Sequence, residues 1–226
     1  MRPPLDVLTQ IYGVTTAADA SMVDALGADH IGVVIDEGIE TWDSVEDAAA
    51  VNIASEVVKA KLVALSLSTE PGRVRRTVEI LQPAILHLAR AVDAMTPNDV
   101  AGLRAELPEL ELMLTVPVRG PEAIAVARRF APVSDYLLLD TAHPVTGVVG
   151  VTGLVHDWGL SASVVQAVEL PVILAGGLDP ANVLNAIDRV RPAGVDSETQ
   201  TSRSDNRRPK DPAKVARFIE LVRSSH

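Results

Sequence analysis

Residues 171–196, PVILAGGLDPANVLNAIDRVRPAGVD, contain the repeating unit that decides the fold. An aliphatic run (171–175) precedes two glycines, a segment with helical spacing of apolar residues (180–191) and a second short aliphatic run (193–196). A strand, a helix and a strand in this order form a βαβ unit, whose two strands lie parallel in one sheet. The stretch therefore predicts a parallel sheet covered by helices.

The same alternation continues outward from this unit along the chain, for eight strand–helix pairs in all. We expect strands at 7–12, 30–35, 62–67, 84–88, 110–116, 136–140, 171–175 and 193–196, and helices at 17–27, 44–59, 71–81, 97–106, 120–130, 158–168, 180–191 and 212–223. Eight such pairs close a (β/α)8 TIM barrel, the α/β fold that we predict as a single domain over residues 1–226. An open doubly wound sheet is the alternative, but it usually begins with a GxGxxG turn, which the first strand here lacks.

Composition narrows the classes of function. The chain has 226 residues, a formal net charge of −10, 3% aromatic residues and no cysteine. The lack of cysteine excludes disulfides, thiolate metal sites and a cysteine nucleophile. The negative charge and scarce aromatic residues argue against a nucleic-acid partner. No apolar stretch is long enough for a membrane span and no signal peptide precedes the first strand, so we expect a cytoplasmic protein with no membrane partner.

Candidate site residues follow from their position, because the site of a (β/α)8 barrel lies at the carboxyl ends of its strands. The residues at or just beyond those ends are Tyr12, Asp36, Glu37, Ser66, His87, Arg90, Thr115, Asp140, Gly176, Gly177 and Asp196 to Thr199.

The paired glycines indicate a phosphate site. Gly176 and Gly177 let the backbone approach a ligand closely, and a helix that opens at Asp179–Pro180 offers free N–H groups and a positive dipole end. A tight strand-to-helix turn would require glycines as well, so a purely structural role stays open.

Asp140 is the best candidate for proton transfer. It ends a very apolar strand, where partial burial would raise its pKa and suit it to donate a proton. The glycines at 147, 150 and 153 predict a flexible loop that closes over substrate. The alternative is that Asp140 only braces that loop.

His87 is open to several roles: an acid–base group, a metal ligand or a structural hydrogen-bonding group, the last being the commonest for a lone histidine. A divalent metal could be held by Asp36, Glu37, His87, Asp140, His143 and Glu198, but no HExxH-like spacing supports this, and we expect neither metal nor cofactor.

These motifs resemble one family, phosphoribosylanthranilate isomerase, along nearly the whole chain. IYGVTTAADASMVDALGADHIGVV (11–34) is similar to its first βαβ unit, and YLLLDT (136–141) with TGLVHDWGL (152–160) to its sixth strand and the following loop. The stretch 171–196 matches most specifically, and PKDPAKVARFIELV (209–222) resembles its closing helix.

The resemblance implies a tryptophan-pathway enzyme, an aldose–ketose isomerase that performs an Amadori rearrangement. In that reaction a general acid protonates the furanose ring oxygen, and a general base removes the C2′ proton. By resemblance Asp140 is the acid, and Gly176, Gly177 and the turn near Thr199 hold the phosphate. From their places at the strand ends and in the sixth loop, Gly153, Asp36, Arg90 and Asp196 are further substrate-binding candidates. The implied partner is a small phosphorylated sugar, bound by a monomer or homodimer.

Three positions depart from the family pattern. Tyr12 replaces the family's basic cysteine, and its pKa near 10 would have to fall by about three units for a base at neutral pH. Asp36 and Glu37 stand where an arginine contacts the anthranilate carboxylate, and Glu198 lies beside the expected phosphate site. Moreover, GVVGVTG (147–153) replaces a tighter glycine run in the sixth loop.

Three functions therefore remain. The first is a phosphoribosylanthranilate isomerase with Asp140 as acid and Tyr12 or His87 in the place of the base. The second is a diverged isomerase, epimerase or aldolase acting on another sugar phosphate. The third is a non-catalytic binding paralogue in which Tyr12 blocks the site.

Overall fold

The computed structural model describes residues 6–35, 37–38, 41–141 and 157–225. Its strands are β1 (Leu8–Ile11), β2 (His30–Ile35), β3 (Ser44–Val45), β4 (Lys61–Ser66), β5 (Ile85–Leu88), β6 (Glu111–Val118), β7 (Tyr136–Thr141), β8 (Val172–Leu174) and β9 (Gly194–Ser197). Its helices are α1 (Ala17–Leu26), α2 (Asp47–Ser55), α3 (Pro71–Leu81), α4 (Ala91–Ala94), α5 (Pro97–Glu106), α6 (Glu122–Phe130), α7 (Trp158–Ala167), α8 (Val183–Val190) and α9 (Pro212–Arg223), with short 3₁₀ turns at Ala131–Val133 and Thr199–Thr201.

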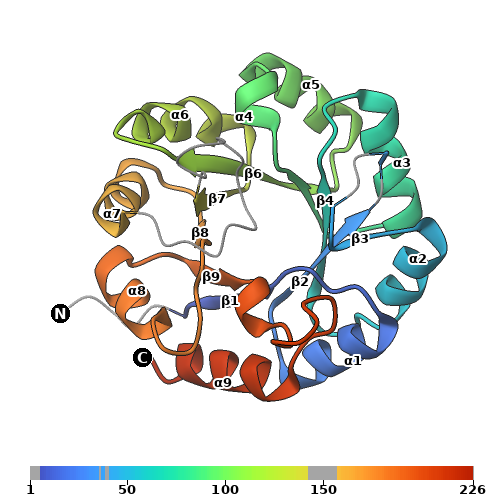
Figure 1. Ribbon diagram of the computed structural model, residues 1–226. Coiled ribbons are helices and arrows are strands. Elements are labelled where there is room, and N and C mark those ends of the chain that lie inside the picture. Colours follow the sequence, from blue (N-terminus) through green and yellow to red (C-terminus); the bar gives the residue numbers. More distant parts are fainter. Residues whose placement is uncertain (1–5, 36, 39–40, 142–156, 226) are drawn as a thin grey trace.

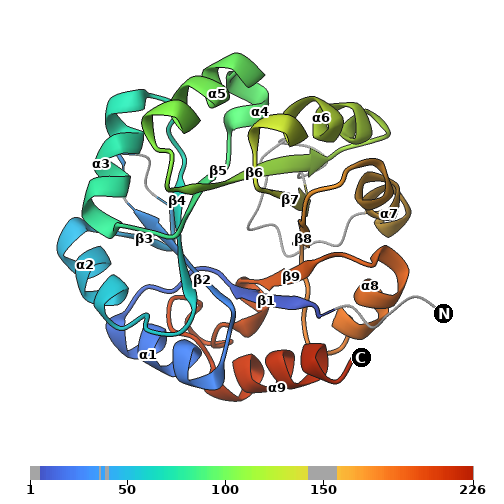
Figure 2. The same ribbon diagram turned by 180° about the vertical axis from the view of Figure 1, so that it is seen from behind.

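The strands form a closed parallel barrel. The sheet runs β1-β9-β8-β7-β6-β5-β4-β2, and the pairing of β1 with β2 closes the ring. Helices surround the ring on all sides, as Figures 1 and 2 show from its two ends. The predicted (β/α)8 barrel is confirmed. Among the described residues, no helix is long and apolar enough to cross a membrane.

Two short elements were not predicted from the sequence. β3 pairs with the last two residues of β2, beyond the part of β2 that pairs with β1: Val34 lies opposite Ser44 and Ile35 opposite Val45. The expected helix at 44–59 is therefore shortened to α2. The four-residue α4 follows β5 directly. Both lie in segments that follow carboxyl ends of strands, where barrel loops vary most.

Local signals set most helix ends. The Thr16 side chain accepts from the Asp19 amide at the start of α1, and Gly27 ends that helix in the left-handed conformation at φ 86°. Thr96 and Asp99 form a reciprocal capping box at α5, and Asp211 caps α9. These caps place the starts of α1, α5 and α9 at the expected helix starts 17, 97 and 212.

Apolar side chains separate into two clusters. The larger fills the layer between strands and helices, and the smaller fills the barrel interior. Members of the interior cluster are Tyr12, Val63, Ile85, Met113, Tyr136, Leu138, Ile173 and Ala175. Alternation along each strand therefore fixes which side chains point inward.

Candidate active site at the carboxyl end of the barrel

The carboxyl ends of the eight barrel strands meet at one end of the molecule, which we call the mouth. Tyr12 directly follows β1, His87 lies in β5, Asp140 in β7 and Asp196 in β9, while Gly176–Gly177 come just after β8. The register places the four side chains on the inward face of their strands. The structure thus brings these predicted residues together.

Tyr12, His87 and Thr115 form a buried hydrogen-bonded chain across the interior. The Tyr12 hydroxyl lies 2.6 Å from Nδ1 of His87, and Nε2 of His87 lies 2.7 Å from the Thr115 hydroxyl. All three residues are buried. The Tyr12 ring passes over Gly32 of the adjacent strand so closely that a Cβ there would collide with it. The chain therefore fixes the phenol on His87.

Neither Tyr12 nor His87 is a base at neutral pH. Burial raises the pKa of Tyr12 well above 10, and the charges of Asp196 and Glu198 add to that rise. Burial also lowers the pKa of His87 to about 3, so its ring is neutral. A neutral ring that accepts from the phenol at Nδ1 carries its proton on Nε2, which donates to Thr115.

Asp140 and Asp196 are the inward carboxyls of the mouth. Burial raises the pKa of Asp140 to about 6, although its side chain keeps part of its surface open. Burial raises the pKa of Asp196 to about 8, and the charge of Asp140 contributes to that rise. Gln10 Nε2 donates to Asp196 at 3.3 Å, and His30 Nδ1 lies 3.1 Å from Gln10 Oε1. Sequence reasoning missed Gln10, although it is the polar residue inside an aliphatic strand, two positions before Tyr12.

The glycine turn after β8 has the conformation that glycine alone adopts readily. Gly176 and Gly177 have φ of 90° and 65°. Asn182 Nδ2 donates to the Gly177 carbonyl at 2.9 Å, and the Ser197 hydroxyl donates to the Leu178 carbonyl at 2.8 Å. The helix expected to open at Asp179–Pro180 begins only at Val183. The Asp179 side chain instead accepts from the amides of Ala181 and Asn182 in a turn that precedes the helix. The turn is thereby fixed against the end of β9.

Glu198 points toward β1 and the segment before β3. A Cβ on Gly13 would lie 3.0 Å from Glu198 Cγ, and Asp43 shares a hydrogen bond with the Glu198 carboxyl. Burial and the Asp43 charge raise the pKa of Glu198 well above its usual value. A raised pKa favours the neutral form of Glu198, which weakens its repulsion of a phosphate.

Residues 201–211 are not the mobile polar loop that the sequence predicted. Ser202 and Lys210 form an antiparallel bridge, and Lys210, only 1% exposed, donates to the Glu198 carbonyl at 2.8 Å. Arg208 donates to the carbonyls of Trp42 and Ser44 at 2.8 and 3.2 Å. The segment after β9 is thus tied to the segment before β3 across the mouth.

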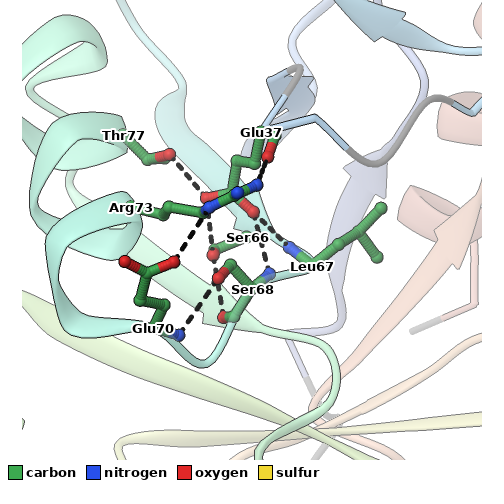
Figure 3. A network of polar contacts seen from close by, with 7 residues as sticks. All are labelled: Glu37, Ser66, Leu67, Ser68, Glu70, Arg73 and Thr77. Atoms are coloured by element: carbon green, nitrogen blue, oxygen red, sulfur yellow. Dashed lines mark hydrogen bonds and ion pairs between the residues drawn. The ribbon is translucent and has the colours of Figure 1, made fainter.

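Glu37 lies outside the mouth, contrary to the sequence prediction (Figure 3). Its carboxylate accepts from the Ser66 and Thr77 hydroxyls at 2.7 and 2.8 Å and from the Leu67 and Ser68 amides at 2.9 and 2.8 Å. Ser66 points outward because Val63 and Leu65 of the same strand point inward. Glu37 therefore lies between the barrel and α3, where it cannot repel a substrate carboxylate.

The remaining predicted residues have the following places. Arg90 is exposed and directly precedes α4, and Thr199 opens the 3₁₀ turn after β9. Asp36 and Gly153 lie outside the described residues, as do the other glycines of that loop and His143. Within the described part of the chain, no group of three or more histidine and carboxylate side chains could hold a metal ion.

Comparison with known proteins assigns the barrel to a family. The family model described as N-(5'phosphoribosyl)anthranilate (PRA) isomerase matches residues 10–220. The chain belongs to the phosphoribosylanthranilate isomerase family. Two N-(5'-phosphoribosyl)anthranilate isomerases are each 34% identical to it: that of Methanocella arvoryzae, covering 95% of this chain and 97% of the relative, and that of Haloferax volcanii, covering 83% and 80%.

Solved structures of phosphoribosylanthranilate isomerases have the same fold. The Thermotoga maritima enzyme superposes with a TM-score of 0.79 at 25% identity, covering 96% of this chain and 99% of its own. The Thermococcus kodakaraensis enzyme gives 0.74 at 26%, with the same coverage. A further isomerase, at 0.77 and 23%, was solved with reduced 1-(o-carboxyphenylamino)-1-deoxyribulose 5-phosphate.

Proposed function

We propose that this chain is a phosphoribosylanthranilate isomerase of tryptophan biosynthesis, with Asp140 as the general acid. Membership of the family over residues 10–220 supports the reaction class. The observation that carries the role of Asp140 is its position: an inward carboxyl at the end of β7, with its pKa raised to about 6 by burial. That value makes the protonated form accessible near neutral pH.

The substrate in this proposal is a small phosphorylated aminosugar. Its phosphate lies at Gly176–Gly177 and the turn that begins at Thr199, where backbone amides face the mouth from two neighbouring strand ends. Its furanose ring lies over Asp140 and Asp196. Asp140 protonates the ring oxygen, and the ring opens to the iminium form. A base then removes the C2′ proton, and no cofactor takes part.

Turnover of phosphoribosylanthranilate by the purified protein tests the proposal. Substrate and aminoketose product are separated by liquid chromatography, and the same gene is tested for rescue of a bacterial strain that lacks this step. We expect conversion by the wild type and a loss of about 10²-fold or more in Asp140→Asn. Neither conversion nor rescue would overturn the assignment.

A second candidate is a binding protein without turnover, favoured by the position of Tyr12. A phenol fixed on His87 at 2.6 Å fills interior space where the family has a thiol. This candidate expects sugar-phosphate binding by calorimetry, reduced by Gly177→Ala, together with the absence of turnover. Turnover above background excludes it.

We further propose that the protein acts in the cytoplasm as a monomer or homodimer. One similar structure, from Thermotoga maritima, is described as monomers generated from a dimeric isomerase; it is 22% identical to this chain and shares its fold. Size-exclusion chromatography with light scattering distinguishes the two states.

A further inference from the structure

The strand register places two carboxyls in the same layer of the barrel interior. Leu138 lies opposite Ile173, and Ile173 lies opposite Gly194. Two residues further along these three strands stand Asp140, Ala175 and Asp196, which share the inward face because side chains alternate. Asp140 and Asp196 therefore flank one residue.

The flanked residue is too small to separate the two carboxyls with a bulky side chain. Ala175 is a member of the interior cluster, and its side chain is a single methyl group. Asp140 and Asp196 interact strongly enough that the charge of Asp140 is the second largest cause of the raised pKa of Asp196, after burial. A charged carboxyl makes the ionisation of a neighbouring carboxyl less favourable.

We propose that Asp196 is the base of the isomerisation and that it forms an acid–base pair with Asp140 across Ala175, the pair holding one proton in the reactive state. The inference rests on the proposed function and supplies the group that the lost thiol would have provided. Tyr12, which occupies the thiol's position, and its neighbour His87 are both unsuited to act as the base. Tyr12 donates to His87, and both ring nitrogens of His87 have partners.

The other groups around Asp196 leave one of its oxygens available. Gln10 donates to Oδ1 and is oriented by His30. The buried Lys210 lowers the pKa of Asp196, and the Asp140 charge raises it. Tyr12 and Glu198 also face it, and burial raises the pKa of each; the phenol of Tyr12, whose pKa lies above 10, is neutral at pH 7. Within the described part of the chain, Oδ2 of Asp196 accepts no hydrogen bond, so we take it as the atom that receives the substrate proton.

The proton balance of the reaction fits a pair with one proton. Asp140 gives its proton to the furanose oxygen, the bond from C1′ to that oxygen breaks, and C1′ becomes part of an iminium ion. Asp196, a carboxylate in this state, takes the proton from C2′, and the C2′–H electrons form the enol-amine that tautomerises to the ketone. Asp196 then releases this proton to solvent and Asp140 takes one up, which restores the starting pair.

Between pH 6 and 8 the pair holds one proton, because the pKa of Asp140 is about 6 and that of Asp196 about 8. Most of that proton is on Asp196, whose pKa is the higher, so the reactive form, with the proton on Asp140, is the minor of the two one-proton forms. Below this range both carboxyls are protonated and the base is lost. Above it both are ionised and the acid is lost. We therefore expect a bell-shaped dependence of kcat on pH, with its maximum near pH 7.

Asp196→Asn is the decisive variant. We expect kcat to fall by about 10²–10⁴-fold with KM changed by less than about threefold, and Asp140→Asn combined with Asp196→Asn to be little worse than either alone. The matched control is Glu37→Gln, a buried carboxylate outside the mouth, which should leave the pH profile unchanged.

Two outcomes separate this inference from the proposed function. A wild type without turnover overturns the function. If the wild type turns over substrate, but Asp196→Asn keeps more than about one tenth of kcat or keeps the bell-shaped pH dependence, the assignment of Asp196 as the base is overturned. Infrared spectroscopy tests the pair without substrate: the C=O band of a protonated carboxyl should disappear between about pH 7 and 9 in the wild type and be absent at pH 7 in Asp196→Asn. Persistence of that titrating band in the variant also overturns the pair.

Discussion

Replacing Glu37 with alanine should destabilise the protein strongly without weakening its binding of a sugar phosphate. The carboxylate is 5% exposed and accepts four hydrogen bonds, two of them from the backbone amides of Leu67 and Ser68. A buried N–H left without a partner costs about 1–3 kcal/mol. Two such groups, with partial relaxation of the hydroxyl donors Ser66 and Thr77, give a loss of about 3–5 kcal/mol.

A graded series makes this estimate testable. In Glu37→Gln the amide oxygen still accepts from Leu67 and Ser68, and the hydroxyls can rotate to accept from the amide nitrogen, so we expect a loss of about 1–2 kcal/mol. Glu70→Ala is the matched control, because the Glu70 side chain is 66% exposed and its only recorded ion pair, with Arg73, lies at the surface. That variant should lose about 0.5 kcal/mol or less.

Urea denaturation followed by circular dichroism measures the three variants, and a thermal shift of about 6–15 °C is expected for Glu37→Ala. The reasoning is refuted if Glu37→Ala and Glu70→Ala unfold within about 0.5 kcal/mol of each other. It is also refuted if Glu37→Gln tightens substrate binding by tenfold at unchanged stability, because that result would place the carboxylate in the mouth.

Three further predictions follow from the interior and the glycine turn. Tyr12→Phe leaves Nδ1 of His87 buried without a donor and should cost about 1–3 kcal/mol in urea unfolding; a neutral result would show that the 2.6 Å contact contributes nothing. Gly177→Ala, at φ 65°, should cost about 1 kcal/mol or more and weaken inorganic phosphate binding in calorimetry, whereas Gly102→Ala, in an open helical position, should stabilise by about 0.5–1 kcal/mol. Asp196→Asn should raise the melting temperature relative to wild type increasingly from pH 4 to 8, since the unfolded carboxyl ionises near 4 and the folded one at about 8; an unchanged difference across this range contradicts the raised pKa.

The segment between the last barrel strand and α9 shows why charge alone misleads. Read as sequence, 201–211 is a polar run with three arginines and a lysine, typical of a solvated loop. In the fold the Lys210 side chain of this segment is buried, and burial lowers its pKa to about 8. Arg208 donates to the carbonyls of Trp42 and Ser44. Which charges become internal depends on which loops meet, and the two loops here are more than 150 residues apart along the chain.

The sequence by itself determined the features that depend on neighbours along the chain. The alternation of aliphatic runs and helical segments predicted the barrel, and Thr16, Gly27 and Thr96 predicted helix ends through bonds within a single turn. The position of Asp140 at a strand end followed from the same local pattern. These features need only short-range sterics and hydrogen bonds, which the residues carry with them.

Only the tertiary structure decided what each buried polar side chain faces. Gly32 leaves room for the Tyr12 ring, which passes so close that a Cβ would collide with it. Nothing along the chain, however, connects Gly32 with Tyr12 or the Tyr12 phenol with His87. The outward turn of Glu37 and the pairing of Asp140 with Asp196 likewise depend on register between strands that closure of the barrel brings together. Desolvation and charge–charge interaction act through space, so their effect on pKa is set when the ring closes.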